Sequence, residues 1–245
     1  MHAIQAIAAM QRGINVYVQK PLTHNIREAR MLTEMARENK IVTQMGNQGA
    51  SNSGMTKVQE WFNDGKIGTV DEVFVWTNRP VWPQGIPVPK PTGSSSPDHL
   101  DWDLWLGTAP SIPYSDAYHP FNWRGWWAYG TGALGDMGCH IIDVPFKTLG
   151  LHYPTAVECS VGQVFINMWD PEYIPEGCPP SSSVTLDFSA TEKNNSPLKM
   201  RWLDGGLRPP HPDLIPANDS LGTPNSGNGV MTVSYTHLRA HETGI

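Results

Sequence analysis

The chain has 245 residues, 39% of them hydrophobic, and a formal net charge of −6. That length indicates one large domain or two moderate ones, and that composition supports a folded core and excludes wholesale disorder. No run of Lys or Arg appears, so no nucleic-acid partner is expected. No apolar stretch approaches the roughly 20 residues that cross a bilayer, so no membrane partner is expected either.

The first residues alternate between helix and strand patterns. The predicted elements are a helix over residues 4–10 ended by Gly13, a strand over 14–18, a helix over 26–40 capped by Thr23 or Asn25, and a strand over 41–45. This order is typical of a parallel sheet with crossover helices. Residues 1–46 are therefore expected to belong to an α/β domain.

Both ends of the chain suggest a piece of a longer protein. Two strands and two helices cannot cover both faces of a parallel sheet, and the first helix pattern has no capping residue before it. We therefore expect Met1 to be an internal methionine, with any export signal upstream, so the localisation could be cytoplasmic or exported. The stretch "VSYTHLRAHET" resembles a translated sequencing adapter, so residues 233–245 are expected to be a non-native tail.

Residues 47–232 predict a second domain of α+β type. A helix pattern over residues 54–68 places Val58, Trp61 and Phe62 on the buried side and closes at Gly65. Strand patterns follow over residues 69–78, 156–166, 183–188 and 198–203. Residues 79–120 are rich in Pro, Gly and Ser and predict an irregular connection, and residues 205–228 predict a loop or disorder.

The stretch "GTGALGDMGCHIID" contains two candidate motifs. Its start spells G-x-G-x-x-G over residues 130–135, which indicates a dinucleotide site only when it follows a strand and opens a helix. The preceding "FNWRGWWAY" is a poor strand pattern. The dinucleotide interpretation is therefore disfavoured, and the glycines are expected to form a turn.

The second half of the same stretch predicts a short helix over residues 134–142, with Pro145 just past its end. Asp136 and His140 are four residues apart and so share one helical face. An imidazole beside a carboxylate is a candidate general base, but such a pair is also common as plain structure. A zinc site that adds Asp143 has no second clustered histidine to support it, and the three cysteines form no C-x-x-C, so no metal is expected.

Several ordered motifs together carry a family resemblance. They are "VYVQKPLT", "TQMGNQG", "DWDLWLGTAP", "PFNWRGWW" and "GDMGCHIID". This combination resembles the Gfo/Idh/MocA oxidoreductases over about residues 1–188. The resemblance implies the C-terminal part of a Rossmann domain that binds NAD or NADP, followed by an α+β domain with a mainly antiparallel open sheet. It also implies a homo-oligomer formed through that sheet, and a phosphate loop upstream of Met1. Residues 1–232 alone should then bind NAD poorly.

The resemblance assigns roles near the first strand. Lys20 matches the family's catalytic lysine, and Pro21 matches the proline after it, across a bond that is often cis. Gln19 stands where the family usually has Glu, which removes a negative charge beside Lys20. Asn47 matches a polar contact to the cofactor.

The resemblance also assigns roles on the predicted helix. Asp136 and His140 match the family's D-x-x-x-H pair, with His140 as the base that takes the hydroxyl proton and Asp136 as the group that orients the sugar or the imidazole. Lys20 and His140 should face one shared pocket. Trp123 and Arg124 are candidates to line the sugar site, with core packing as the alternative for Trp123.

Three functions follow from this resemblance. The leading one is an oxidoreductase that transfers hydride between NAD or NADP and a hydroxyl of a sugar, polyol or related carbohydrate. The second is a glycosidase that uses NAD transiently and releases aglycone with no net NADH. The third is a non-catalytic sugar-binding relative.

Overall fold

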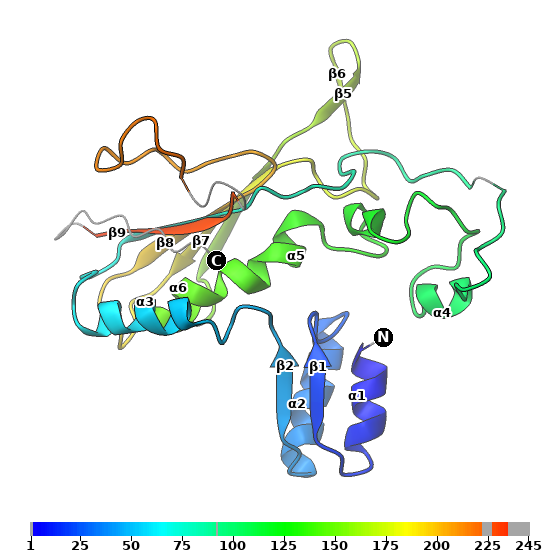
Figure 1. Cartoon of the computed structure of the whole chain (residues 1–245), viewed down its shortest axis with the longest axis horizontal. Helices are drawn as coiled ribbons and strands as arrows, with labels where there is room; N and C mark the ends of the chain where they lie inside the picture. Colours follow the sequence, from blue (N-terminus) through cyan, green and yellow to red (C-terminus); the bar gives the residue numbers. More distant parts are fainter. Residues whose placement is uncertain (1, 92, 222–226, 235–245) are drawn as a thin grey trace. The chain divides into compact units, whose positions relative to one another are not determined.

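The computed structural model describes residues 2–91, 93–221 and 227–234 (Figure 1). The chain divides into two compact units, Met1–Gln48 with Asp101–Pro110, and Gly49–Leu100 with Ser111–Ile245. The expected domains 1–46 and 47–232 stay a prediction. Of the expected tail, residues 235–245 lie outside the described residues. No described helix is long and apolar enough to span a bilayer.

The first unit alternates helices and strands as the sequence predicts. Its elements are α1 (His2–Met10), β1 (Val16–Gln19), α2 (Ile26–Glu38), β2 (Thr43–Gly46) and α4 (Trp102–Leu106). The strands β1 and β2 pair in parallel, and α1 and α2 contribute the buried residues Ala3, Ala6, Met10 and Leu32. Asn25 is the cap of α2, because its side chain accepts a hydrogen bond from the Glu28 amide.

Helix α4 corrects the prediction that residues 79–120 are irregular throughout. The Asp101 side chain accepts a hydrogen bond from the Leu104 amide at 3.0 Å and so caps the helix. The rings of Trp102 and Trp105 stack with centroids 4.6 Å apart. Five residues are too few for a clear 3.6-residue period, which is why the sequence pattern missed this helix.

The second unit carries a five-stranded mixed sheet (Figure 1). In spatial order its strands are β4 (Ala156–Val161), β7 (Ser182–Phe188), β8 (Leu198–Leu203), β3 (Glu72–Trp76) and β9 (Gly229–Val233). Only β3 and β8 pair in parallel among these five strands, and the other three pairings are antiparallel. The expected α+β domain with a mainly antiparallel sheet is confirmed.

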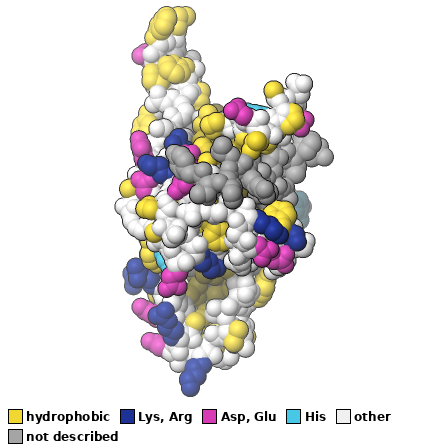
Figure 2. Space-filling model, turned by 90° about the vertical axis from the view of Figure 1, so that its left-hand side faces the viewer, with side chains coloured by type: hydrophobic (Ala, Val, Ile, Leu, Met, Phe, Trp, Pro, Cys, Tyr) yellow, Lys and Arg dark blue, Asp and Glu magenta, His cyan; other side chains and the backbone are white. Residues whose placement is uncertain are grey.

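Two strand predictions need correction. The pattern over residues 156–166 splits, because β5 (Val164–Asn167) leaves the sheet and pairs with β6 (Asp170–Glu172) in a separate hairpin. The hairpin and its base expose large apolar side chains, Met168, Trp169 and Tyr173, each more than four-fifths exposed. In Figure 2 hydrophobic side chains gather on the projection at the top of the view, which is the β5–β6 hairpin. Strand β9 was not predicted.

Three α-helices and a 3-10 turn complete the second unit. They are α3 (Ser53–Asn63), η1 (Asn122–Gly125), α5 (Gly132–Ile141) and α6 (Asp143–Thr148). In α3 the buried residue is Met55, whereas the predicted Val58, Trp61 and Phe62 are only partly buried against the core. Pro145 lies past the end of α5, as the sequence predicts, but a further helix, α6, begins before it. Pro145 falls in the first turn of α6, where a missing N–H leaves no hydrogen bond unmade.

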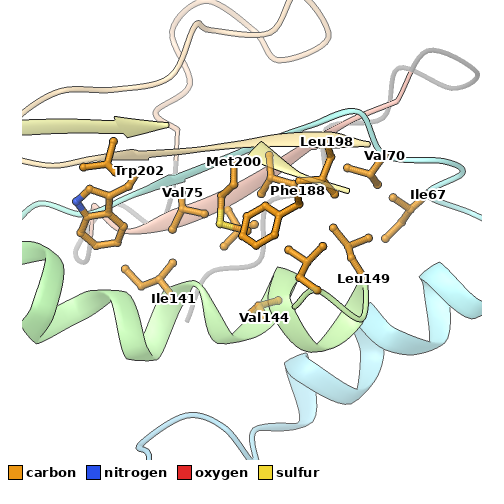
Figure 3. Packing of buried hydrophobic residues seen from close by; sticks show 14 of the residues in the cluster. Ile67, Val70, Val75, Ile141, Val144, Leu149, Phe188, Leu198, Met200 and Trp202 are labelled. Carbon is orange, nitrogen blue, oxygen red and sulfur yellow. The ribbon is translucent and has the colours of Figure 1, made fainter. Parts of the chain in front are cut away.

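The core of the second unit lies between one face of the sheet and the helices (Figure 3). Because side chains alternate along a strand, Val73 and Val75 of β3 point into this core, while Phe74 and Trp76 belong to a smaller cluster. In Figure 3, Ile141 and Val144 lie across from Trp202 and Met200. Helix α5 is thereby fixed on the sheet through its apolar side.

Asn194 joins two distant segments inside this core. Its side chain accepts a hydrogen bond from the Val70 amide and donates to the Val70 carbonyl, each at 2.8 Å, and it donates to the Ser196 carbonyl at 2.8 Å. The residue is only 2% exposed. It therefore ties the segment before β3 to the segment before β8.

We expect Asn194→Ala to lower the free energy of unfolding by about 2–4 kcal/mol, because it leaves buried backbone groups of Val70 without partners. Chemical denaturation measures this loss. The matched control is Asn195→Ala, whose exposed side chain accepts one bond from Thr69 Oγ1 at 3.2 Å and should change stability by less than about 0.5 kcal/mol. Equal losses in both variants would contradict the assigned role.

Asp204, directly after β8, is a buried carboxyl with three donors around it. It accepts hydrogen bonds from the Ser182 amide, the Ser182 hydroxyl and Trp202 Nε1. Burial raises its pKa above the usual value of 3.8, and the three hydrogen bonds offset part of that rise. The folded protein therefore binds this proton more tightly than the unfolded chain does.

The stability that Asp204 contributes is present in full below its unfolded pKa and is lost as the pH rises through the raised folded pKa. We expect the free energy of unfolding, measured relative to Asp204→Asn, to fall as the pH rises above 3.8. Urea denaturation of both proteins across this pH range measures the difference. Parallel pH profiles would show that the Asp204 carboxyl is not held in its neutral form by folding.

Candidate active site

The carboxyl ends of β1 and β2 bring four predicted residues to one edge of the first unit. Gln19 pairs with Gly46 in the parallel register, so Lys20 and Pro21 leave β1 at the same edge at which Asn47 leaves β2. The Lys20 amide donates to Gln19 Oε1 at 2.8 Å and to the Gly46 carbonyl at 3.4 Å. The predicted cis bond between Lys20 and Pro21 is present.

Gly46 lets the side chains of β1 lie against the end of β2. A Cβ atom at this position would lie 2.7 Å from Tyr17 Cε1 and 3.3 Å from Gln19 Oε1. Because Gly46 has no side chain, the Gln19 side chain can lie across the strand ends. Gln19 occupies this place although the family usually has Glu here.

This edge fits a dinucleotide cofactor. Ligands of open α/β sheets bind outside the carboxyl ends of the strands, and Gln19, Lys20 and Asn47 carry amide and ammonium groups suited to ribose and amide oxygens. The fit rests on the strand register and on the chemistry of these side chains.

Helix α5 of the second unit carries Asp136 and His140 one turn apart, both partly buried. The arrangement agrees with the predicted shared face. Asp143, which the zinc alternative would need, forms an ion pair with Lys147 at 3.0 Å. The described residues hold no cluster of three or more His, Cys, Asp or Glu that could bind a metal ion.

Gly130, before α5, and Gly132, the first residue of α5, pack against neighbouring protein atoms. A Cβ at Gly130 would lie 2.5 Å from Arg124 Cα, and one at Gly132, where φ is +60°, would lie 2.9 Å from Cys178 Cβ. The segment follows η1 and a turn and does not follow a strand. The motif therefore does not follow a strand, which agrees with the disfavoured dinucleotide interpretation. The expected turn is wrong for most of the motif, because Gly132–Gly135 form the first turn of α5.

Arg124 and Asp136 meet at the start of α5. Arg124 Nε lies 3.3 Å from Asp136 Oδ1, and both side chains are about one-fifth exposed. The guanidinium carbon lies 4.5 Å from the ring centroids of both Phe121 and Trp123, and 5.7 Å from that of Trp82. The structure thus brings together three predicted site residues, Trp123, Arg124 and Asp136, and adds two that the sequence did not indicate.

Tyr118 lies next to this region but belongs to the core. It is 1% exposed, and its ring meets Trp126 and Tyr129 edge-on. Burial, with a smaller contribution from Tyr129, raises the pKa of Tyr118 to about 12. The residue therefore remains a neutral phenol at physiological pH.

A mainly apolar cavity of about 340 Å³ lies beside the start of α5. Its lining includes Trp127, Leu134, Val161, Tyr173 and Cys178. None of the predicted site residues lines it. The cavity and the Arg124–Asp136 pair are therefore two different features of the second unit.

Comparisons with known proteins define the class of this chain. Residues 1–47 match a sequence model described as "Oxidoreductase family, NAD-binding Rossmann fold", and residues 74–163 match one described as "Oxidoreductase family, C-terminal alpha/beta domain". Together the two regions make up more than half of the chain, and both belong to one family of NAD-binding oxidoreductases. The chain belongs to the Gfo/Idh/MocA family.

Solved structures share this fold. GenD2 from gentamicin A biosynthesis, in complex with NAD, is 18% identical with a TM-score of 0.59, covering 98% of this chain and 51% of its own. The WlbA dehydrogenase from Bordetella pertussis, in complex with NADH and UDP-GlcNAcA, is 13% identical with a TM-score of 0.57, covering 96% and 50%. A putative myo-inositol dehydrogenase from Sinorhizobium meliloti 1021 is 15% identical with a TM-score of 0.55, covering 99% and 54%.

The chain spans about half the length of these structures. At these identities the likeness concerns the fold. No curated protein matches the chain.

Proposed function

We propose that the complete protein is an oxidoreductase that transfers hydride between NAD or NADP and a hydroxyl group of a sugar, polyol or related carbohydrate. The observation that carries the proposal is the sequence Gln19-Lys20-Pro21 at the carboxyl edge of a parallel strand pair that matches an NAD-binding Rossmann fold. The carbohydrate class is supported by the sugar nucleotide bound to WlbA and by the name of the inositol dehydrogenase relative. The expected homo-oligomer through the C-terminal sheet stays a prediction.

In this proposal Gln19, Lys20, Pro21 and Asn47 hold the cofactor at the strand ends. The bound nicotinamide supplies the hydride acceptor or donor. The Lys20 ammonium donates a hydrogen bond to the substrate oxygen and counters the negative charge that develops there as the hydroxyl loses its proton.

His140 is the proposed general base. It takes the hydroxyl proton of the substrate, a role that contributes about 10²–10⁴ in rate. Asp136, one helical turn before His140, orients the sugar or the imidazole. Trp123 offers an aromatic face to the sugar ring, on the side that the Arg124 guanidinium does not cover.

We expect His140→Asn in the complete protein to lower kcat by about 10²–10⁴ with a smaller change in KM, because the amide cannot accept the substrate proton at neutral pH. The production of NADH from myo-inositol, UDP-GlcNAcA and a panel of hexoses identifies the substrate, and steady-state kinetics on it measures the loss.

The matched control is His152→Asn, an exposed histidine after α6 in the same unit, which should leave kcat unchanged. Circular dichroism verifies that both variants fold. Wild-type turnover by folded His140→Asn would remove His140 from catalysis.

A further inference from the structure

Arg124 is held along its edge by hydrogen-bond acceptors. Nε donates to Asp136 Oδ1 at 3.3 Å, and Nη1 donates to the carbonyl of Phe121 at 3.0 Å. A guanidinium is planar and its donors point in fixed directions, so two acceptors on different segments restrict its rotation. One of these acceptors lies on the η1 segment and the other on α5.

The flat face of Arg124 is held by aromatic rings. The guanidinium carbon lies 4.5 Å from the ring centroids of Phe121 and Trp123, within the range of a cation–π interaction. Trp82 supports this group, because its ring meets Phe121 edge-on at 5.8 Å and its Nε1 donates to Gln84 Oε1 at 2.9 Å. Trp82 is only 5% exposed, so neighbouring protein atoms surround its ring on nearly all sides.

The backbone around Arg124 is also confined. A Cβ at Gly125 would lie 2.0 Å from the Pro83 carbonyl oxygen, and a Cβ at Gly130 would lie 2.5 Å from Arg124 Cα. Only glycine allows these two close approaches. The segment that carries Arg124 therefore packs against residues before it and residues after it in the sequence.

We propose that Arg124 is a positioning residue that fixes the Asp136 carboxylate on α5, and that Phe121, Trp123 and Trp82 fix Arg124. This role rests on the proposed function, in which Asp136 and His140 act on the sugar. It differs from the sequence-based expectation that Arg124 contacts the sugar. A guanidinium whose Nε, Nη1 and faces are already engaged is better suited to hold a neighbouring carboxylate than to follow different substrate hydroxyls.

The kinetic signature separates the two roles. Loss of a direct sugar contact that is equal in the ground state and the transition state raises KM and leaves kcat unchanged. Loss of a positioning residue lowers kcat, because a misplaced group near the reacting atoms can cost up to about 10²-fold in rate. We therefore expect Arg124→Gln in the complete protein to lower kcat by about 10- to 100-fold with little change in the KM for the sugar.

Two further variants test whether Arg124 acts through Asp136. Arg124→Lys restores a positive charge but not the planar fork, so we expect kcat between those of the wild type and Arg124→Gln. The double variant Arg124→Gln/Asp136→Asn should be no slower than Asp136→Asn alone, because Arg124 then has no carboxylate to position. Additive losses in kcat, or a rise in KM alone, would overturn the positioning role.

The chain offers a matched control for the loss of an arginine. Arg201 Nε lies 2.9 Å from Glu72 Oε1, and its guanidinium carbon lies 5.7 Å from the Phe74 ring, on strands of the sheet. Arg201→Gln therefore removes the same kind of ion pair and ring contact from the same unit. It should leave kcat unchanged, and a loss equal to that of Arg124→Gln would mean that both variants act through folding.

The experiments distinguish failure of the proposed function from failure of the positioning role. If the wild-type complete protein oxidises no sugar or polyol in the panel, the proposed function fails and the positioning role fails with it. If the wild type is active and folded Arg124→Gln keeps its kcat, the proposed function stands and the positioning role alone is wrong.

Discussion

The parallel pairing of β3 with β8 is the constraint on which the second unit depends. These central strands are more than 120 residues apart in the sequence, and their pairing closes a loop that contains η1, α5, α6 and the β5–β6 hairpin. Asn194 ties the segments that lead into both strands. Because Ile141 of α5 packs on the core side of this sheet, the pairing also fixes the helix that carries Asp136 and His140.

The first unit also depends on one parallel strand pair, β1 with β2. A parallel register between β1 and β2 is enough to place Lys20 and Asn47 at one edge, since the carboxyl ends of parallel strands always lie at the same side. Gly46 then allows Gln19 to lie across that edge. The chemistry proposed for this family member thus depends on backbone pairing in one unit and on helix packing in the other.

Local patterns predicted the parts of the fold that repeat over many residues. The amphipathic helix α2, with Asn25 as one of two candidate caps, and the strand β3 were visible in the sequence. The sequence pattern of β3 suggested one buried face, whereas the strand is buried on both faces. Shorter or more distant features were not. Strand β9 has only five residues and was not predicted, and no pattern indicated that a second helix, α6, begins at Asp143, directly after α5.

The candidate site around Asp136, too, was predicted only where its residues lie close together in the sequence. The spacing of Asp136 and His140 predicted their shared helical face, and Trp123 and Arg124 are neighbours in the sequence. No pattern indicated Trp82, because its support of Arg124 through Phe121 arises only from the packing of segments some 40 residues apart. Contacts of this kind, between an arginine and aromatic rings from separate segments, become visible only when the tertiary structure is known.

Direct transfer of hydrogen from the substrate carbon to the cofactor is the central claim of this account. The measurement is mass spectrometry of the cofactor after the complete protein has been incubated with NAD⁺ and carbon-deuterated myo-inositol, with deuterated UDP-GlcNAcA and hexoses as further substrates. The account predicts that the reduced cofactor gains one deuterium for each carbohydrate oxidised. Conversion of the carbohydrate with no net formation of deuterated NADH would contradict it and favour a transient oxidation of the kind that a glycosidase uses.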